Sequence, residues 1–485
     1  MAKRKNVILI LSDQQRRDTV AAYGEGLCDI VKTPNIDQLA AEGMKFTNAY
    51  TTSAICAPAR ASVMTGLYPH KHGVIDNFTD IVEGTPLLGE CMRDAGYFCG
   101  YAGKWHVSPN KTPEECGFHE GKPFMGYAFP GSQVFPHLIF NQPPDNKPNY
   151  YEEYLNEKGF ENIDVSHGFL GDNPALQIQE MFCKHEGPIE STIEYFVAQE
   201  TNRIIDMAKD QDKPFFIWSN FWGPHSPSIV PEPYYSMYDP KSIPEHPSYC
   251  DTFEDKPYGY YLSEKMWGLG NYGWEGFQEI IARYLGHCTM IDDMVGMIVD
   301  KLKAEGLYDD TIIIYSADHG DCLGAHKLIE KGAFTFEEIY HIPMVVKGAG
   351  TKDNDCFVTL QELMPTILDI AGAEPPQPVD GQSILPLMMG EQEDNGRTEM
   401  FGEYHNHFYI ARQRMVRDHD FQLTFNESEK GELYDLKKDP YQLHNVAYDP
   451  AYADVKKKYM DILGQHLKET NDPASVWFHR IKEFY

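Results

Sequence analysis

The stretch Asn6–Asp13, NVILILSD, decides the fold class of this chain. Its apolar residues from Val7 to Leu11 form an unbroken run, which is typical of a strand buried on both faces of a parallel sheet. The next periodic segment is TPNIDQLAAEG, in which Pro34 begins a predicted helix and Gly43 ends it. A buried strand followed by a helix is the repeating unit of an α/β fold.

Three later segments repeat this plan. Buried strands are predicted at 214–220 (PFFIWSN), within GYFCGYAGKWH before Lys104, and at 311–316 (TIIIYS). A long amphipathic stretch at about 277–305 precedes the last of them. Strands that alternate with helices predict a doubly wound α/β sheet.

The length of 485 residues and a change in composition predict two domains. Residues 371–383 are rich in Pro and Gly, so we place a catalytic domain at 1–375 and a smaller α+β domain at 376–485. Within the second, 408–425 alternates like antiparallel strands and 449–470 is a final amphipathic helix. Residues 117–190 show little periodicity and are expected to form loops over the sheet.

The net charge of −31 limits the classes of partner that this chain can bind. Such a surface repels nucleic acid and anionic membranes, so neither is expected as a partner. No stretch approaches the roughly 18 apolar residues of a membrane span, and the apolar run after the N-terminal basic residues is too short for a signal peptide. With ten scattered cysteines and no C-x-x-C pair, we expect free thiols and a cytoplasmic location.

Polar residues follow several predicted strands at the same edge of the sheet. They are Asp13, Lys104, His106, His225, Asp318 and His319. In open α/β sheets ligands bind at the carboxyl ends of the strands. Any one such histidine is more often a hydrogen-bonded loop residue, but the shared placement favours a functional site.

The residue types at this edge suit a metal ion and an anion. Asp13 and Asp318 offer carboxylates, Gln14 an amide oxygen and His319 an imidazole nitrogen. Around them, cationic side chains could surround a tetrahedral anion and histidines could move protons; these candidates are Arg60, Lys104, Lys331, His106 and His225. The alternatives are that Asp13 and Asp318 cap turns, and that Lys331 is a solvated neighbour of Glu330.

The stretch Ser53–Gly66, SAICAPARASVMTG, contains a cysteine whose role the residues alone leave open. Cys56 could be a packed thiol, a metal ligand, a nucleophile or the precursor of another group. C-A-P-A-R followed by ASVMTG resembles the C-x-P-x-R motif of the type I, formylglycine-dependent sulfatases. The resemblance runs from about Asn6 to Asn445, through segments that include TGLYPHKHGV, GKWHVS, GPHSP, YSADHGDCLGAHK and GELYDLKKDPYQLHN.

The resemblance implies a fold and a reaction. The expected fold is alkaline-phosphatase-like: a large mixed, mostly parallel sheet flanked by helices, with a smaller C-terminal domain that carries an antiparallel sheet. In this family a formylglycine-generating enzyme converts the cysteine to an aldehyde, which hydrates to a diol. One hydroxyl attacks the sulfur of a sulfate monoester to give a covalent sulfo-enzyme, and the other then expels sulfate.

The resemblance also assigns roles to residues of this chain. Cys56 is the formylglycine precursor, and Arg60, one helical turn later, orients the diol and balances its charge. Lys104 and Lys331 contact sulfate oxygens, His106 takes the proton of the diol, and His225 protonates the leaving alcohol. The metal-ligand positions are Asp13, Gln14, Asp318 and His319, with Cys56 beside them. The helix that Pro58 is expected to begin would aim backbone N–H groups at the anion.

Two positions depart from the pattern of the family. Gln14 replaces a second acid, and His319 stands where an asparagine is frequent. The resemblance implies Ca²⁺, but calcium prefers oxygen ligands, so Mn²⁺ or Mg²⁺ stays open.

Two further interpretations of the function stay open. The chain could be a phosphonate monoester or phosphodiester hydrolase of the same superfamily, although Lys104 and His106 favour a sulfatase. It could also bind sulfated ligands without Cys56 being converted. For the substrate, the negative charge favours small esters or short sulfated oligosaccharides over sulfated polymers.

Tyr404, His405 and His407 are interpreted as solvated loop residues, in preference to residues that approach the site.

Overall fold

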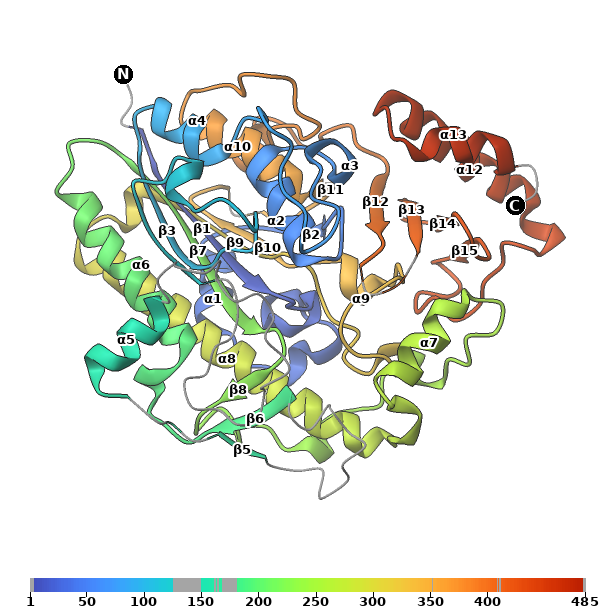
Figure 1. The fold of residues 1–485 in the computed structure, drawn as a ribbon, viewed down its shortest axis with the longest axis horizontal. Coiled ribbons are helices and arrows are strands. Elements are labelled where there is room, and N and C mark those ends of the chain that lie inside the picture. Colours follow the sequence, from blue (N-terminus) through green and yellow to red (C-terminus); the bar gives the residue numbers. More distant parts are fainter. Residues whose placement is uncertain are drawn as a thin grey trace.

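The computed structural model describes residues 4–124, 150–160, 163, 165–167, 181–350, 352–407, 409 and 411–482. Its largest sheet has eight strands in the order β11-β2-β10-β9-β1-β7-β3-β4 (Figure 1). Of these, β10 pairs antiparallel with both of its neighbours, while the other pairs are parallel. The mixed, mostly parallel sheet expected from the sequence is therefore confirmed. The strands are β1 (Asn6–Asp13), β2 (Gly43–Tyr50), β3 (Phe98–Lys104), β4 (Glu120–Phe124), β7 (Phe215–Pro224), β9 (Thr311–Ala317), β10 (Met344–Lys347) and β11 (Asn354–Thr359).

Strand β1 lies inside the sheet, between β7 and β9, and Val7–Leu11 are fully buried. Alternate side chains of β1 enter two different cores, because successive residues of a strand point to opposite faces. One core contains residues of α1, α6 and α8, and the other contains residues of α2, α4 and α10 (Figure 1). The helices of these layers are α1 (Pro34–Ala41), α2 (Cys56–Thr65), α4 (Leu88–Asp94), α6 (Ile193–Lys209), α8 (Trp274–Ala304) and α10 (Leu363–Ile370).

Gly43 follows the first helix as predicted, but its main role is different. It has no positive φ, and it begins β2 rather than ending a helix in the left-handed conformation. A Cβ atom at this position would lie 2.1 Å from the carbonyl oxygen of Val346 on β10. The pairing of β2 with β10 therefore requires glycine here.

A second sheet of four antiparallel strands follows near the C-terminus (Figure 1). It contains β12 (Met400–His405), β13 (Arg412–Arg417), β14 (Phe421–Asn426) and β15 (Glu432–Asp435). Apolar residues of this sheet pack against α12 (Ala453–Glu469) and α13 (Ala474–Ile481). The antiparallel strands and the helix predicted at 449–470 are confirmed, but this helix is not the last one, because α13 follows it. The division at residues 375 and 376 stays a prediction.

The remaining elements lie outside these two sheets. A three-stranded sheet contains β5 (Val165–His167), β6 (Phe182–His185) and β8 (Ser228–Val230). The other helices are α3 (Pro69–His72), α5 (Tyr150–Lys158), α7 (Tyr258–Met266), α9 (Glu337–Tyr340) and α11 (Leu385–Met388). Much of the loop region predicted at 117–190 lies outside the described residues.

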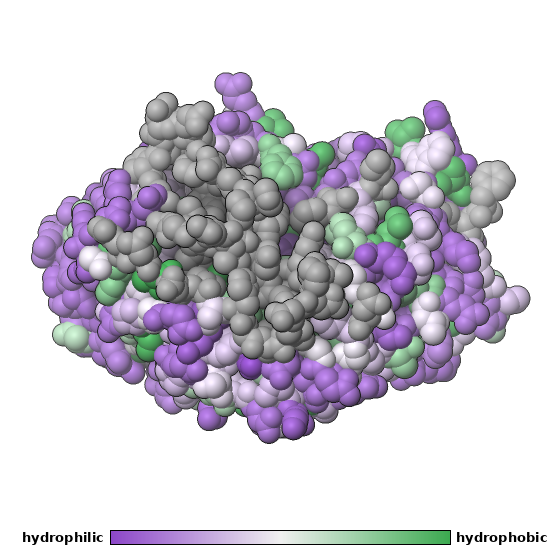
Figure 2. Space-filling view, turned by 60° about the horizontal axis from the view of Figure 1, so that its bottom comes forward, coloured by the Kyte–Doolittle hydropathy of each residue, from purple (hydrophilic) through white to green (hydrophobic). Residues whose placement is uncertain are grey.

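The described surface shown in Figure 2 is mostly hydrophilic. Among the coloured residues on the face in Figure 2, hydrophilic side chains predominate and apolar ones occur in small separate groups. In the described part of the chain, no helix is both long enough and apolar enough to cross a membrane.

Candidate active site

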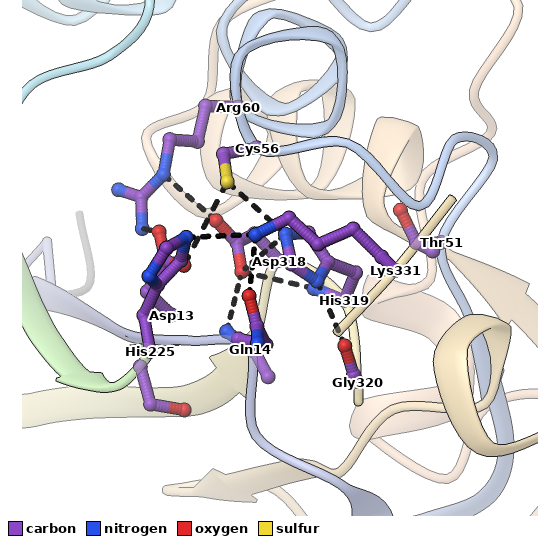
Figure 3. Close-up of polar contacts among 12 residues, drawn as sticks. Asp13, Gln14, Thr51, Cys56, Arg60, His225, Asp318, His319, Gly320 and Lys331 are labelled. Atoms are coloured by element: carbon purple, nitrogen blue, oxygen red, sulfur yellow. Dashed lines mark hydrogen bonds and ion pairs between the residues drawn. The ribbon is translucent and has the colours of Figure 1, made fainter. Parts of the chain in front are cut away.

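Four strands of the large sheet bring side chains to one place at their carboxyl ends; Figure 3 shows three of these side chains, those of Asp13, His225 and Asp318. Asp13 ends β1 and Lys104 ends β3, while Asp318 and His225 directly follow β9 and β7. The three parallel pairs β3·β7, β7·β1 and β1·β9 bring these ends to the same edge. The topology therefore brings together residues that lie as many as 305 positions apart in the sequence, from Asp13 to Asp318.

Cys56 is the first residue of α2 and is 1% exposed. Its Sγ lies 3.1 Å from His319 Nε2, 3.7 Å from Asp13 Oδ1 and 3.9 Å from Lys104 Nζ. The thiol is thus enclosed by the residues at the strand ends, which rules out the interpretation of Cys56 as an ordinary thiol in an apolar core.

The prediction that backbone N–H groups at the start of this helix point at an anion is wrong for the residues after Cys56. We call this predicted arrangement the anion cradle. The N–H of Ala57 donates to Asn77 Oδ1 (3.1 Å), and that of Ala59 donates to the carbonyl oxygen of Ile55 (3.0 Å). Pro58 is the third residue of the helix and has no N–H. Positive charge for an anion must therefore come mainly from side chains.

Arg60 lies one turn along α2, fully buried, and joins two strand ends. Its Nη2 donates to Asp13 Oδ2 and its Nε to Asp318 Oδ2, each at 2.9 Å. Nη1 donates to Asn220 Oδ1 (2.6 Å) and to the carbonyl oxygen of Lys104 (3.2 Å). These contacts use the planar fork of the guanidinium to fix both carboxylates. The role of Arg60 in orienting the nucleophile stays a prediction.

A potential metal-binding cluster lies at the centre of this arrangement. One ligand atom from each of Asp13, Cys56, Asp318 and His319 lies within 4.8 Å of the others, and all four residues are buried. The ring of His319 is held by a contact of 2.9 Å between Nδ1 and the carbonyl oxygen of Gly320, so Nε2 faces Cys56 (Figure 3). A backbone partner on Nδ1 is the usual way to fix an imidazole for a metal.

Gln14 has a positive φ of 65° and its side chain is held at both ends. Its Nε2 donates to Asp321 Oδ2, and its Oε1 accepts from Lys331 Nζ, each at 2.5 Å. Asp321 accepts in addition from the N–H groups of Leu323 (2.7 Å) and Glu330 (2.9 Å), which fixes its position. Asp321 therefore sets the direction of the Gln14 amide, so that its oxygen lies on the side of Lys331.

Lys331 is buried rather than solvated, which corrects the alternative of an exposed lysine. Its Nζ contacts Glu330 Oε2 (3.0 Å) and donates to His225 Nε2 (2.7 Å). The His225 side chain is 15% exposed and its Nε2 lies 3.8 Å from Asp13 Oδ1. Among these groups, His225 therefore lies nearest to solvent.

The charges around Cys56 favour an anion at its position. Burial raises the pKa of the thiol, but the positive charges of Lys104 and Lys331 outweigh burial and hold the pKa well below its usual range. Lys104 is itself fixed by Asp13 Oδ2 (2.7 Å) and by the Trp222 ring, whose centroid is 4.4 Å from Nζ.

The pKa values of the two carboxylates are shifted in opposite directions. Burial and the charge of Asp13 raise the pKa of Asp318. Burial also raises the pKa of Asp13, but the nearby cations, Lys104 first among them, outweigh it and the pKa is lowered. Two adjacent buried carboxylates repel each other, and a divalent cation between them would relieve that repulsion.

His106 lies beside the nucleophile position as well. It has a φ of 39° and is hydrogen-bonded to Cys56. Burial lowers its pKa, which favours the neutral ring, the form that can accept a proton.

Several residues at the site were missed or misjudged from the sequence. Asn220 was a polar residue in a buried strand, and this could have identified it as a partner of Arg60. Asp321 belongs to the quoted segment YSADHGD, and Asn77 lies outside the residues that the sequence predicts for the site. The prediction of a solvated His407 is wrong, because this residue is 3% exposed, and burial and the positive charge of Lys331 lower its pKa. His405 and Tyr404 are buried too, so the interpretation as solvated residues is wrong for all three.

Comparisons with known proteins agree with this arrangement. The family model described as Sulfatase matches residues 5–373, and that of N-sulphoglucosamine sulphohydrolase, C-terminal, matches residues 324–469. The multifunctional alkaline phosphatase superfamily protein PehA of Trinickia caryophylli is 31% identical, over 94% of each chain. The N-acetylglucosamine-6-O-sulfatase of Bacteroides thetaiotaomicron is 26% identical, over 97% of this chain and 88% of the relative. The crystal structure of a phosphonate monoester hydrolase of Agrobacterium radiobacter aligns with a TM-score of 0.80 at 25% identity, over 96% of each chain.

The fold and the buried cluster at its strand ends define a hydrolase of the alkaline-phosphatase-like superfamily. Since the family model covers more than half of the sequence, the chain belongs to the sulfatase family, whose members are sulfuric ester hydrolases. The family assignment made from the motifs is confirmed.

Proposed function

We propose that this chain hydrolyses sulfate monoesters with a formylglycine made from Cys56 and a divalent metal ion. The observation that carries the proposal is the buried cluster of Asp13, Cys56, Asp318 and His319, whose ligand atoms lie within 4.8 Å of one another. Lys104 and Lys331 add positive charge around this cluster. A metal site beside a nucleophile position enclosed by cations fits a tetrahedral anion.

The donor set fits a divalent metal. Two carboxylates and an imidazole nitrogen converge, and the amide of Gln14, next to Asp13 in the chain, is held in direction by Asp321 and Lys331. A metal bound there would polarise a sulfate oxygen and lower the pKa of a bound hydroxyl group. Because the set is mostly oxygen, we propose Ca²⁺, with Mn²⁺ or Mg²⁺ as the alternatives that the imidazole keeps open.

The position of Cys56 fits its proposed conversion. Formylglycine supplies two hydroxyl groups on one carbon, one for attack on sulfur and one for the release of sulfate. The start of α2 holds this carbon at the cluster, and Arg60 in the next turn holds the two carboxylates that would flank it. The chain itself thus supplies the position and the charge for the nucleophile.

The two lysines have geometry suited to the sulfate oxygens. Lys104 lies 3.9 Å from Cys56 Sγ, and Lys331 donates to both Gln14 and His225. When the ammonium group of Lys331 donates to a sulfate oxygen instead of to His225, the Nε2 of His225 loses this hydrogen bond.

The two histidines can then move protons in opposite directions. The burial-lowered pKa of His106 favours a ring that accepts a proton from the nucleophile. His225 lies beside Asp13 Oδ1 and nearer to solvent, so its Nε2, once released by Lys331, can take up a proton from solvent and pass it to the leaving alcohol. Asp13 would stabilise the protonated imidazole of His225 during that step.

The function is tested with chain produced together with a formylglycine-generating enzyme. Mass analysis of the Cys56 peptide should show a loss of roughly 18 Da, since an aldehyde oxygen replaces the thiol. The converted protein should release sulfate from an aryl sulfate, and the unconverted protein should not. Converted protein that releases no sulfate from any ester would refute the proposal.

Removal of the metal is expected to abolish activity and to lower thermal stability. A ligand that binds only the native state at about 100 times its Kd stabilises that state by about 2.7 kcal/mol. We expect Ca²⁺ added after chelation to restore sulfate release and to raise the Tm. The variant Asp318→Asn should lose this rise, whereas Asp454→Asn, a change of an exposed carboxylate, should keep it. Equal responses of the two variants would contradict a metal site at Asp318.

A second candidate function is supported by the solved phosphonate monoester hydrolase and by PehA. Sulfate and phosphonate monoesters are both tetrahedral, but we infer that the cation Lys104 and the base His106 beside the nucleophile position favour a sulfate. We therefore expect a higher kcat/KM for an aryl sulfate than for the matched aryl phosphonate, measured on one preparation. Faster turnover of the phosphonate would make this chain a phosphonate hydrolase instead.

For the substrate, we propose a small or short-oligosaccharide sulfate ester. The similarity to the N-acetylglucosamine-6-O-sulfatase of B. thetaiotaomicron supports a sulfated sugar. The net charge of −31 disfavours binding of long sulfated polymers. A panel of sulfated sugars and polymers, scored for released sulfate, tests this assignment.

A further inference from the structure

The segment after β12 returns to the active site and places His407 beside the start of α2. The Nε2 atom of His407 lies 3.3 Å from Asn77 Nδ2. Asn77 Oδ1 accepts the N–H of Ala57, the residue next to Cys56, at 3.1 Å. One amide therefore links the backbone at the nucleophile to a residue of the C-terminal part of the chain.

This link also fixes the protonation of His407. Because the oxygen of Asn77 accepts from Ala57, its Nδ2 must be the donor to His407. Nε2 of His407 is then an acceptor, and the ring is neutral with its proton on Nδ1. Burial and the positive charge of Lys331 lower the pKa of His407 to about 4, which agrees with a neutral ring.

The surroundings of His407 place it within the electrostatic reach of the reacting groups. After burial, the groups that shift its pKa are Lys331 and His106, which lower it, and Cys56, which raises it. The carboxylate of Asp76, next to Asn77, also acts on this pKa and raises it. This side of the site therefore offers neutral hydrogen-bonding groups beside an acidic residue.

Phe78 continues this side of the site outward. It is 66% exposed, and its ring centroid lies 6.1 Å from that of His407. The carbonyl oxygen of His407 accepts from the N–H of Tyr409 (2.6 Å) and from the hydroxyl of Tyr404. The backbone at His407 is thereby held in place, and we name Asn77, Phe78 and His407 the neutral wall.

We propose that His407 contacts the alcohol part of the ester, and that the neutral wall selects uncharged cyclic alcohols over alcohols that carry a second anionic group. A sugar or aryl ring offers an apolar face to Phe78, and a ring hydroxyl or oxygen can bond the imidazole. A second sulfate or carboxylate would meet the neutral side chains of this wall and the carboxylate of Asp76. This inference rests on the proposed function and names the substrate class of the same site.

The test compares matched substrates: an aryl sulfate with and without a ring carboxylate, and a monosaccharide carrying one or two sulfates. We expect the protein to prefer the singly charged member of each pair. In His407→Ala, kcat/KM for the singly charged esters should fall about tenfold, mainly through KM, and the preference should narrow. Phe78→Ala, a change of an exposed side chain, should also reduce the preference for the singly charged esters, without affecting folding.

A matched control and the possible outcomes complete the design. His444→Ala removes an exposed histidine of the same C-terminal region and should leave the preference unchanged. The inference is overturned if the protein prefers the doubly charged esters, or if both wall variants retain the original preference. If converted protein hydrolyses no sulfate ester at all, the proposed function has failed and the inference fails with it, an outcome separate from an unchanged preference.

Discussion

Cys56→Ala is expected to lower kcat/KM for an aryl sulfate by at least about 10⁴-fold, because loss of an attacking group removes the covalent pathway altogether. The rest of the site would stay in place, since Arg60 still bridges Asp13 and Asp318 and does not depend on the thiol. We therefore expect the Tm to change little while sulfate release is lost. Parallel measurement of both quantities separates a missing nucleophile from a damaged fold.

Two further variants sharpen this prediction. Cys250→Ala changes an exposed cysteine and should keep full activity. Cys56→Ser retains an oxygen nucleophile, and where the mass of its peptide shows an unconverted serine it should give at most one turnover per active site. Sustained turnover by Cys56→Ser would show that the second hydroxyl group is not required, and the proposed role of formylglycine would be wrong.

The sequence was sufficient for the parts of the fold that depend on local pattern. The unbroken apolar run Val7–Leu11 predicted a strand buried on both faces, and all five residues are fully buried. The order of strands in the sheet also placed Asp13, Lys104, His225 and Asp318 at one edge, as parallel connections require.

Contacts between distant side chains could not be predicted in this way. The direction of the Gln14 amide depends on Asp321, which in turn depends on the N–H groups of Leu323 and Glu330. The expected anion cradle failed because Asn77, a residue on another loop, takes the N–H of Ala57. His407 was misjudged for the same reason: its burial depends on how the segment after β12 packs, and no pattern within GEYHNHFY contains that information.

Arg60→Met is expected to have the second large effect, and here the fold and the chemistry change together. The substitution keeps much of the side-chain volume but removes the charge that balances Asp13 and Asp318, all three of which are fully buried. Removing one partner of a buried ion pair costs about 3–5 kcal/mol of unfolding free energy. We expect a loss of that size in denaturant unfolding, together with a fall in kcat/KM of at least about 100-fold, since the metal-ligand carboxylates lose their orientation.

The pH dependence identifies the cause of this loss. Without Arg60 the pKa of Asp318, already raised by burial and by Asp13, should rise further in the native state. A carboxyl whose native pKa is raised takes up a proton on folding, so its ionisation destabilises the native state as the pH rises through that pKa. The difference in unfolding free energy between Arg60→Met and the parent should therefore grow from pH 5 to pH 8. Arg412→Met, a change of an exposed arginine, should show no such trend, and an equal loss at all pH values would point to lost packing instead of unbalanced carboxylates.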